Sequence, residues 1–142
     1  MNWLPRETVL VPIDFSENSF AAMQAAGEMV DDPAHLHAVH VLPSLQPNDP
    51  GVIWYKIDDE SRSKHAAEAL RAELAGRGHQ QPTIAIRIGD PGREIVEYAR
   101  EISAGLIIVS CHGQSGLKHL LIGSVAERVV RLAHCPVLVL KG

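Results

Sequence analysis

The sequence contains few of the residues that mark specialised classes of protein. Aromatic residues make up only 4% of the chain, and the two cysteines are Cys111 and Cys135. Two cysteines do not make a disulfide framework, and neither belongs to a Cys-x-x-Cys pair, so we expect both to be reduced thiols. A flavin site would need aromatic shields, for which Trp54 and Tyr55 are the only candidates.

The sequence also lacks an excess of positive charge and any long apolar run. Its 13 Lys and Arg residues are outnumbered by 17 Asp and Glu residues, whereas binding to a phosphate backbone requires a basic excess. No apolar run approaches the roughly 20 residues that span a bilayer, and the first residues do not resemble a signal peptide. We therefore expect a cytoplasmic protein that neither binds nucleic acid nor inserts into a membrane.

The composition is that of an ordinary globular domain, with 46% hydrophobic and 21% charged residues. A chain of 142 residues fits one compact domain and is too short for two of full size. We expect residues 1–142 to fold as a single domain around one core.

Five short apolar runs, separated by segments with helical periodicity, predict the strands of one sheet. The last two runs are apolar throughout, as in strands covered on both faces, and the second and third carry polar side chains, as in strands nearer an edge. The runs are residues 9–13, 36–41, 84–88, 106–109 and 137–140. Alternating strands and helices predict an α/β fold of Rossmann-like type, an open five-stranded parallel sheet with helices on both faces.

Each expected helix has a start signal. Ser16 is the expected N-cap of a helix over residues 17–30, and Asp90 with Pro91 opens another. A long surface helix is expected over residues 58–76. The spacing from Ser124 to Glu127 matches a capping box at the start of the last helix.

Ligands of open α/β sheets bind beyond the carboxyl ends of the strands, where neighbouring crossovers diverge. Asp14 follows the first strand, and a glycine-bearing stretch over residues 113–124 follows the fourth and leads into a helix. Glycine permits positive φ, and the free amides of Gly123, Ser124 and Val125 would point with the helix dipole at an anion. The stretch lacks the Gly-Lys-Ser/Thr of a phosphate loop, which argues against fast phosphoryl transfer.

Simpler interpretations remain open at this stage. The glycines could serve only to shape a strand-to-helix connection, and Asp14 could serve only to interact with the N-terminus of the first helix. We expect no metal site, because His35, His37 and His40 do not form a compact ligand set on their strand. Cys111 and His112 are adjacent in a turn and do not match a nucleophile with its base.

Several segments together resemble the universal stress protein family over nearly the whole chain. They are residues 9–16, 40–41, 89–91, 110–125 and 135–140. Nucleotide-binding members of that family carry glycine, two residues, glycine, nine residues, then glycine and Ser or Thr. In this chain the second glycine is Gly113 and the final pair is Gly123-Ser124, while Ser110 replaces the first glycine. Serine at a position of positive φ would be strained.

The resemblance implies the strand order 3-2-1-4-5 and the binding of an adenine nucleotide, ATP or else ADP or AMP, with Mg²⁺ accompanying ATP. It implies at most slow hydrolysis, a homodimer formed through the last strand, and an unidentified protein partner in a stress response. The alternative is an interaction module of the same fold that binds no nucleotide. The implied contacts are Asp14 and the backbone near Pro12 and Val41 for adenosine, and Ser110, Gly113, Gly123, Ser124 and Val125 for the phosphates.

Overall fold

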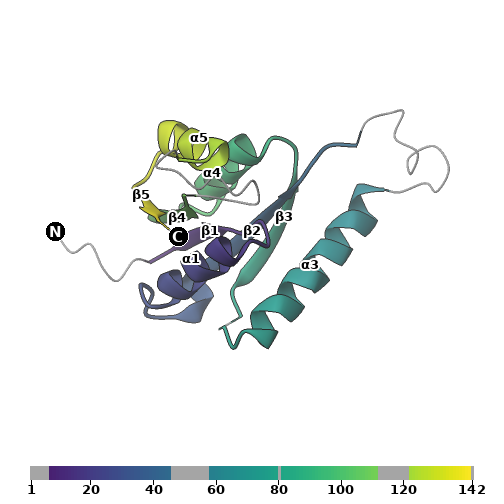
Figure 1. Cartoon of the computed structure of the whole chain (residues 1–142), viewed down its shortest axis with the longest axis horizontal. Helices are drawn as coiled ribbons and strands as arrows, with labels where there is room; N and C mark the ends of the chain where they lie inside the picture. The colour runs from purple at the N-terminus through teal and green to yellow at the C-terminus, as the bar shows by residue number, and fades with distance from the viewer. Residues whose placement is uncertain (1–6, 46–57, 80, 112–121, 142) are drawn as a thin grey trace.

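The computed structural model describes residues 7–45, 58–79, 81–111 and 122–141. Strands and helices alternate along these ranges, as the apolar pattern predicts (Figure 1). The strands are β1 (Val9–Pro12), β2 (Leu36–Leu42), β3 (Thr83–Ile88), β4 (Leu106–Ser110) and β5 (Val137–Leu140). The helices are α1 (Glu17–Gly27), the 3₁₀ helix η1 (Pro33–His35), α3 (Asp59–Gly76), α4 (Pro91–Glu101) and α5 (Ser124–Leu132).

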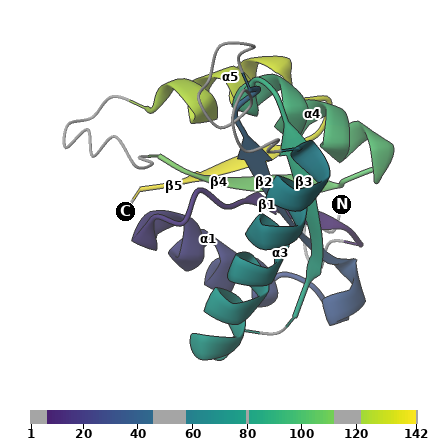
Figure 2. The same ribbon diagram turned by 90° about the vertical axis from the view of Figure 1, so that its right-hand side faces the viewer.

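All neighbouring strand pairs are parallel, and the sheet has the order β3-β2-β1-β4-β5, which confirms the expected fold and strand order. Helices α1 and α3 cover one face of the sheet, and α4 and α5 cover the other (Figures 1 and 2). Side chains of a strand alternate between the two faces. Val9 and Val11 accordingly pack with Phe20 of α1, whereas Leu10 packs with Ile95 of α4.

Three of the expected helix starts are confirmed by side-chain hydrogen bonds. Ser16, Asp58 and Asp90 are the N-caps of α1, α3 and α4, and each side chain accepts a hydrogen bond from a backbone N–H three residues later. Several strand ends differ from the prediction by one residue, and two further differences concern helices. Helix α1 ends at Gly27 rather than at residue 30, and His35 belongs to η1 rather than to the second strand.

The expected capping box at the last helix is wrong. The N-cap of α5 is Gly123, with φ −64° and ψ 158°, which has no side chain to cap the helix. Ser124 is instead the first residue of the helix. Because the first amides of a helix have no acceptor within the helix, α5 starts with backbone donors that its N-cap residue does not satisfy through a side chain.

The two edges of the sheet differ in charge. At the β3 edge, the Arg87 guanidinium is paired with Glu94 at 3.1 Å and with Glu101 at 2.8 Å. The other edge is β5, whose residues are all Val or Leu and all partly exposed. Charged side chains protect a sheet edge against pairing with another chain, so β3 carries such protection and β5 does not. None of the helices in the described ranges is long and apolar enough to cross a membrane.

Candidate functional site

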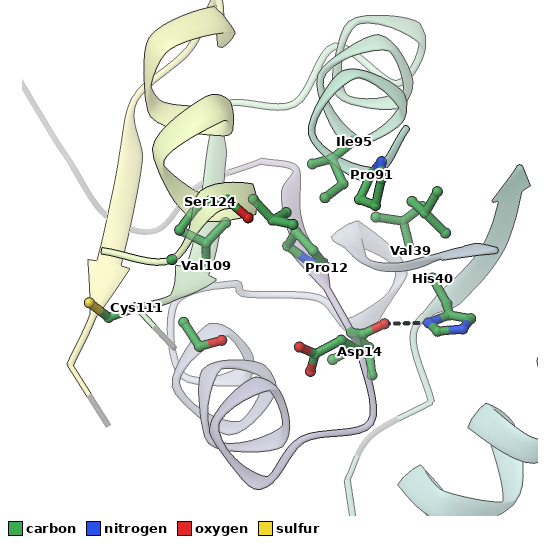
Figure 3. A pocket seen from close by; sticks show the side chains of 15 residues that line it. Pro12, Asp14, Val39, His40, Pro91, Ile95, Val109, Cys111 and Ser124 are labelled. Carbon is green, nitrogen blue, oxygen red and sulfur yellow. Dashed lines mark hydrogen bonds between the residues drawn. The ribbon is translucent and has the colours of Figure 1, made fainter. Parts of the chain in front are cut away.

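A pocket of about 320 Å³ opens at the carboxyl ends of β1, β2 and β4 (Figure 3). It lies where β1 and β4 are neighbours and the chain continues from them to helices on opposite faces of the sheet. This is the place where ligands bind in open α/β sheets. The lining residues are Pro12, Ile13, Asp14, Val39, His40, Val41, Pro91, Ile95, Val109, Ser110, Cys111, Gly123, Ser124, Val125 and Ala126.

The structure brings together seven of the eight residues named from the sequence. They are Pro12, Asp14, Val41, Ser110, Gly123, Ser124 and Val125. The eighth, Gly113, lies outside the described residues, as do His112, Trp54 and Tyr55.

The sequence reasoning missed the contribution of α4 to the pocket. Pro91 and Ile95 of this helix line it, together with Val39 of β2. The spacing of apolar residues along α4 predicts that Ile95 is buried. That spacing does not indicate that the start of α4 lies beside the end of β1.

The turn between β1 and α1 presents Asp14 to the pocket. Its carboxylate accepts hydrogen bonds from the Ser16 amide, at 2.9 Å, and from the Ser16 hydroxyl. In Figure 3 the carboxylate is directed towards the side of the pocket where Cys111 and Ser124 lie. Asp14 therefore has two roles. It binds Ser16 at the start of α1, and it lines the pocket.

Helices α1, α4 and α5 all begin close to this pocket, but their N-termini differ. The Ser16 side chain caps α1 and the Asp90 side chain caps α4. At α5 the N-cap residue Gly123 supplies no side-chain cap, so among the described residues the amides of Ser124, Val125 and Ala126, at the positive end of the helix dipole, are donors directed at the pocket.

Gly123 has a different role from the one expected. Its amide is not free, because it donates a hydrogen bond of 2.7 Å to the Cys111 carbonyl. Its φ of −64° is negative, so positive φ does not explain the glycine. A Cβ at this position would lie 3.0 Å from the same carbonyl oxygen. A side chain would crowd that carbonyl, so glycine favours the close approach of the start of α5 to the end of β4.

Ser110 is compatible with the backbone at its position. It is the last residue of β4 and lies opposite Leu140 in the sheet. The described non-glycine residues with positive φ are Phe15 and Ser103. Serine in place of the first glycine of the motif therefore creates no strain at this position.

The pocket has little positive charge of its own. Its described lining includes the carboxyl group of Asp14, the imidazole of His40 and the buried thiol of Cys111, but no lysine or arginine. Backbone amides are therefore the main donors for an anion in the described part of the pocket.

The two histidines of β2, His37 and His40, face opposite sides of the sheet, as the alternation along a strand predicts. His37 faces α4, where its ring lies 3.1 Å from the Tyr98 hydroxyl, and burial lowers the pKa of His37. His40 faces the opposite side of the sheet, and its ring lies 4.9 Å from that of Phe15. Within the described ranges, no group of three His, Cys, Asp or Glu side chains is placed to hold a metal ion.

Comparison with known proteins gives a consistent result. The family model described as the universal stress protein family matches residues 5–141. Universal stress protein MJ0531 of Methanocaldococcus jannaschii is 33% identical over 94% of this chain and 81% of its own length. Universal stress protein YxiE of Bacillus subtilis is 33% identical over 94% of this chain and 97% of its own length.

Solved structures share the fold. The structure of hypothetical protein MJ0577 superposes with a TM-score of 0.75 at 27% identity, covering 98% of each chain. A universal stress protein in complex with cAMP has a TM-score of 0.66 at 23% identity, covering 96% of this chain and 97% of its own. One from Archaeoglobus fulgidus in complex with dAMP has a TM-score of 0.60 at 21% identity, covering 98% of each chain. The match of the family model over nearly all of the sequence, on this sheet order, shows that the chain belongs to the universal stress protein family.

Proposed function

We propose that this chain binds an adenine nucleotide, ATP or else ADP or AMP, in the pocket between β1 and β4, and that it acts in a cytoplasmic stress response through a protein partner. The observation that carries the proposal is the N-terminus of α5, whose N-cap residue Gly123 supplies no side-chain cap and which lines the same pocket as the Asp14 carboxylate. One end of the pocket thus offers donors for phosphate and another offers an acceptor for hydroxyl groups.

The shape and chemistry of the pocket suit a nucleoside. Its volume of about 320 Å³ lies at the lower end of the range of about 300–1,000 Å³ of small-molecule sites. Val39, Val41 and Ile95 supply apolar surface for a base. Asp14 would accept hydrogen bonds from the ribose hydroxyls, and the backbone near Pro12 and Val41 would hold the adenosine.

Phosphate groups would be held by the start of α5. The amides of Ser124, Val125 and Ala126 are the donors in this proposal, and the hydroxyls of Ser110 and Ser124 add to them. The Gly123 amide is excluded by its bond to Cys111, so Gly123 contributes by allowing α5 to approach β4 closely.

A magnesium ion bound with ATP would be held mainly by the phosphates. The described residues contain no group of three metal-ligating side chains, and Mg²⁺ commonly binds through one or two carboxylates together with substrate phosphates. The proposal is therefore one of binding, with at most slow hydrolysis.

The nucleotide class also agrees with two proteins of the same fold, whose structures hold cAMP and dAMP. At 23% and 21% identity they share the fold alone. The pocket of this chain carries the proposal.

The amide of Ser124 provides a direct test. Ser124 is the first helical residue, and Gly123 before it is extended, with ψ 158°, so proline fits at position 124. Ser124→Pro removes the amide and the hydroxyl, whereas Ser124→Ala removes only the hydroxyl. Loss of one hydrogen bond to a charged group is worth about 1.5–3 kcal/mol, so titration calorimetry with MgATP is expected to give roughly ten- to hundredfold weaker binding for Ser124→Pro than for Ser124→Ala.

The melting temperature without ligand serves as the control in that experiment, because proline at the first position of a helix preserves its stability. If folded Ser124→Pro binds MgATP as tightly as Ser124→Ala does, the start of α5 is not the phosphate site.

The rival function is that of an interaction module of the same fold that has lost its nucleotide. A variant of Ser110 distinguishes the nucleotide-binding function from this rival, because Ser110 replaces the first glycine of the nucleotide-binding motif. Since Ser110 is not at positive φ, we expect Ser110→Gly to change the calorimetric Kd for MgATP by less than about threefold, a difference of about 0.65 kcal/mol. A wild type without measurable binding, together with a Ser110→Gly variant that binds, would favour the rival.

We further propose that two copies of the chain pair through β5. This edge strand is apolar, unlike the β3 edge, and Val130 of α5 is 47% exposed. Arg128 packs on Gly92 of α4, and Val130 lies about 200° further round the helix, on the side away from α4. An exposed valine beside an unprotected edge strand fits an interface with a second copy.

Val139→Pro tests this pairing. The carbonyls of Pro136 and Leu140 accept hydrogen bonds from β4, so the alternating backbone groups of Val137 and Val139 point outwards. Proline at 139 removes an outward N–H while sparing the ladder with β4. Light scattering is expected to give twice the 15.4 kDa chain mass for the wild type and the single mass for Val139→Pro. Thr83→Lys, on the opposite edge, should leave the dimer intact, and a monomeric wild type would contradict the proposal.

A further inference from the structure

His40 makes an unusual contact with the strand beside it. Its Nδ1 atom lies 2.6 Å from the backbone carbonyl oxygen of Ile13 (Figure 3). A carbonyl oxygen can only accept a hydrogen bond, so Nδ1 must carry the proton and donate it. The contact therefore fixes the orientation of the ring and places a proton on Nδ1.

Ile13 is the residue at which β1 leaves the sheet. The register between β1 and β2 ends with Pro12 opposite Val39. The Ile13 amide still donates to the Val39 carbonyl at 2.8 Å, and the Ile13 carbonyl accepts from the His40 side chain. Both backbone polar groups of Ile13 are thus hydrogen-bonded to β2. The amide binds a backbone carbonyl, and the carbonyl binds the His40 side chain instead of a backbone amide of the sheet.

Phe15, the residue after Asp14, is also fixed by contacts with its neighbours. Phe15 has φ 66°, a conformation that is rare and costly for a bulky side chain. Its ring meets the His40 ring edge to face, with centroids 4.9 Å apart, and meets the Phe20 ring in the same way at 6.1 Å. Such conformations persist where surrounding contacts over-determine them, and His40 supplies one of these contacts.

Asp14 therefore lies between two residues that His40 holds. We propose that His40 is a positioning residue for Asp14: its hydrogen bond to Ile13 is the main contact that fixes the turn directing the Asp14 carboxylate into the nucleotide pocket, and its ring contact with Phe15 is secondary. This inference rests on the proposed function and adds to it the residue that sets the position of the adenosine-binding carboxylate.

Three variants separate the hydrogen bond from the ring. His40→Phe keeps an aromatic ring against Phe15 and loses the donor, whereas His40→Asn places an amide N–H near the position of Nδ1 and loses the ring. His37→Phe is the matched control, since it removes a ring nitrogen bound to Tyr98 on the opposite face of the same strand. Each variant is titrated with MgATP by calorimetry, and its melting temperature is measured without ligand.

We expect His40→Phe to bind MgATP about tenfold more weakly than the wild type, with its melting temperature little changed. Rescue by His40→Asn to within about threefold of the wild type identifies the donor as the part that matters, and His37→Phe should bind as the wild type does. Unchanged affinity in His40→Phe would overturn the proposal. So would an equal loss in His40→Asn, or an equal loss in His37→Phe.

Nitrogen-15 NMR of the histidine rings in the ligand-free protein provides a second readout that needs no nucleotide. We expect His40 to be in the tautomer with the proton on Nδ1, and a proton on Nε2 alone would overturn the proposal. If the wild type binds no MgATP but His40 has the expected tautomer, the proposed function fails, while the hydrogen bond from His40 to the Ile13 carbonyl in the turn is supported. The two failures are therefore distinguishable.

Discussion

The whole site depends on one constraint, the order of strands in the sheet. Because β1 and β4 are neighbours and the chain leaves them for helices on opposite faces, none of the helices in the described ranges covers the space beyond their carboxyl ends. The pocket forms there, and the turn after β1, the end of β4 and the starts of α4 and α5 all contribute to it. The apolar cores on the two faces, built from alternating side chains of the same strands, hold these ends in place.

The electrostatic character of the pocket follows from which helix starts are capped. Ser16 and Asp90 satisfy the first amides of α1 and α4, whereas the close approach of Gly123 to Cys111 sets the start of α5 without a side-chain cap. A pocket whose described lining lacks lysine and arginine then has its donors concentrated at one helix end. This arrangement favours an anion whose shape lets it hydrogen-bond to the amides at the start of α5, since there is no lysine or arginine in the described lining to attract acidic groups in general.

Much of this architecture could be predicted because short-range rules determine it. Continuous apolar runs marked the strands, and Ser16 and Asp90 were recognisable as caps because the amides they bind lie only three residues away. Seven of the eight residues named from the sequence line one pocket, and Gly113 lies outside the described residues.

The errors have physical causes that a linear pattern does not contain. The spacing of Ser124 and Glu127 satisfies the capping-box rule, but the bond from Gly123 to Cys111 shifts the cap by one residue. The negative φ of Gly123 and the strand conformation of Ser110 depend on how β4 meets α5 and β5. The contact of His40 with Ile13 joins residues 27 positions apart, and no local signal predicts it.

The most direct test of the account is an NMR titration of the ¹⁵N-labelled protein with MgATP, followed through the backbone amides. The account predicts saturable shifts at Ser124, Val125, Ala126 and Asp14, which lie around one pocket but far apart in the sequence. It would be contradicted if these amides did not move, or if the shifts were confined to the separate hollow lined by Met23, Leu36 and His79.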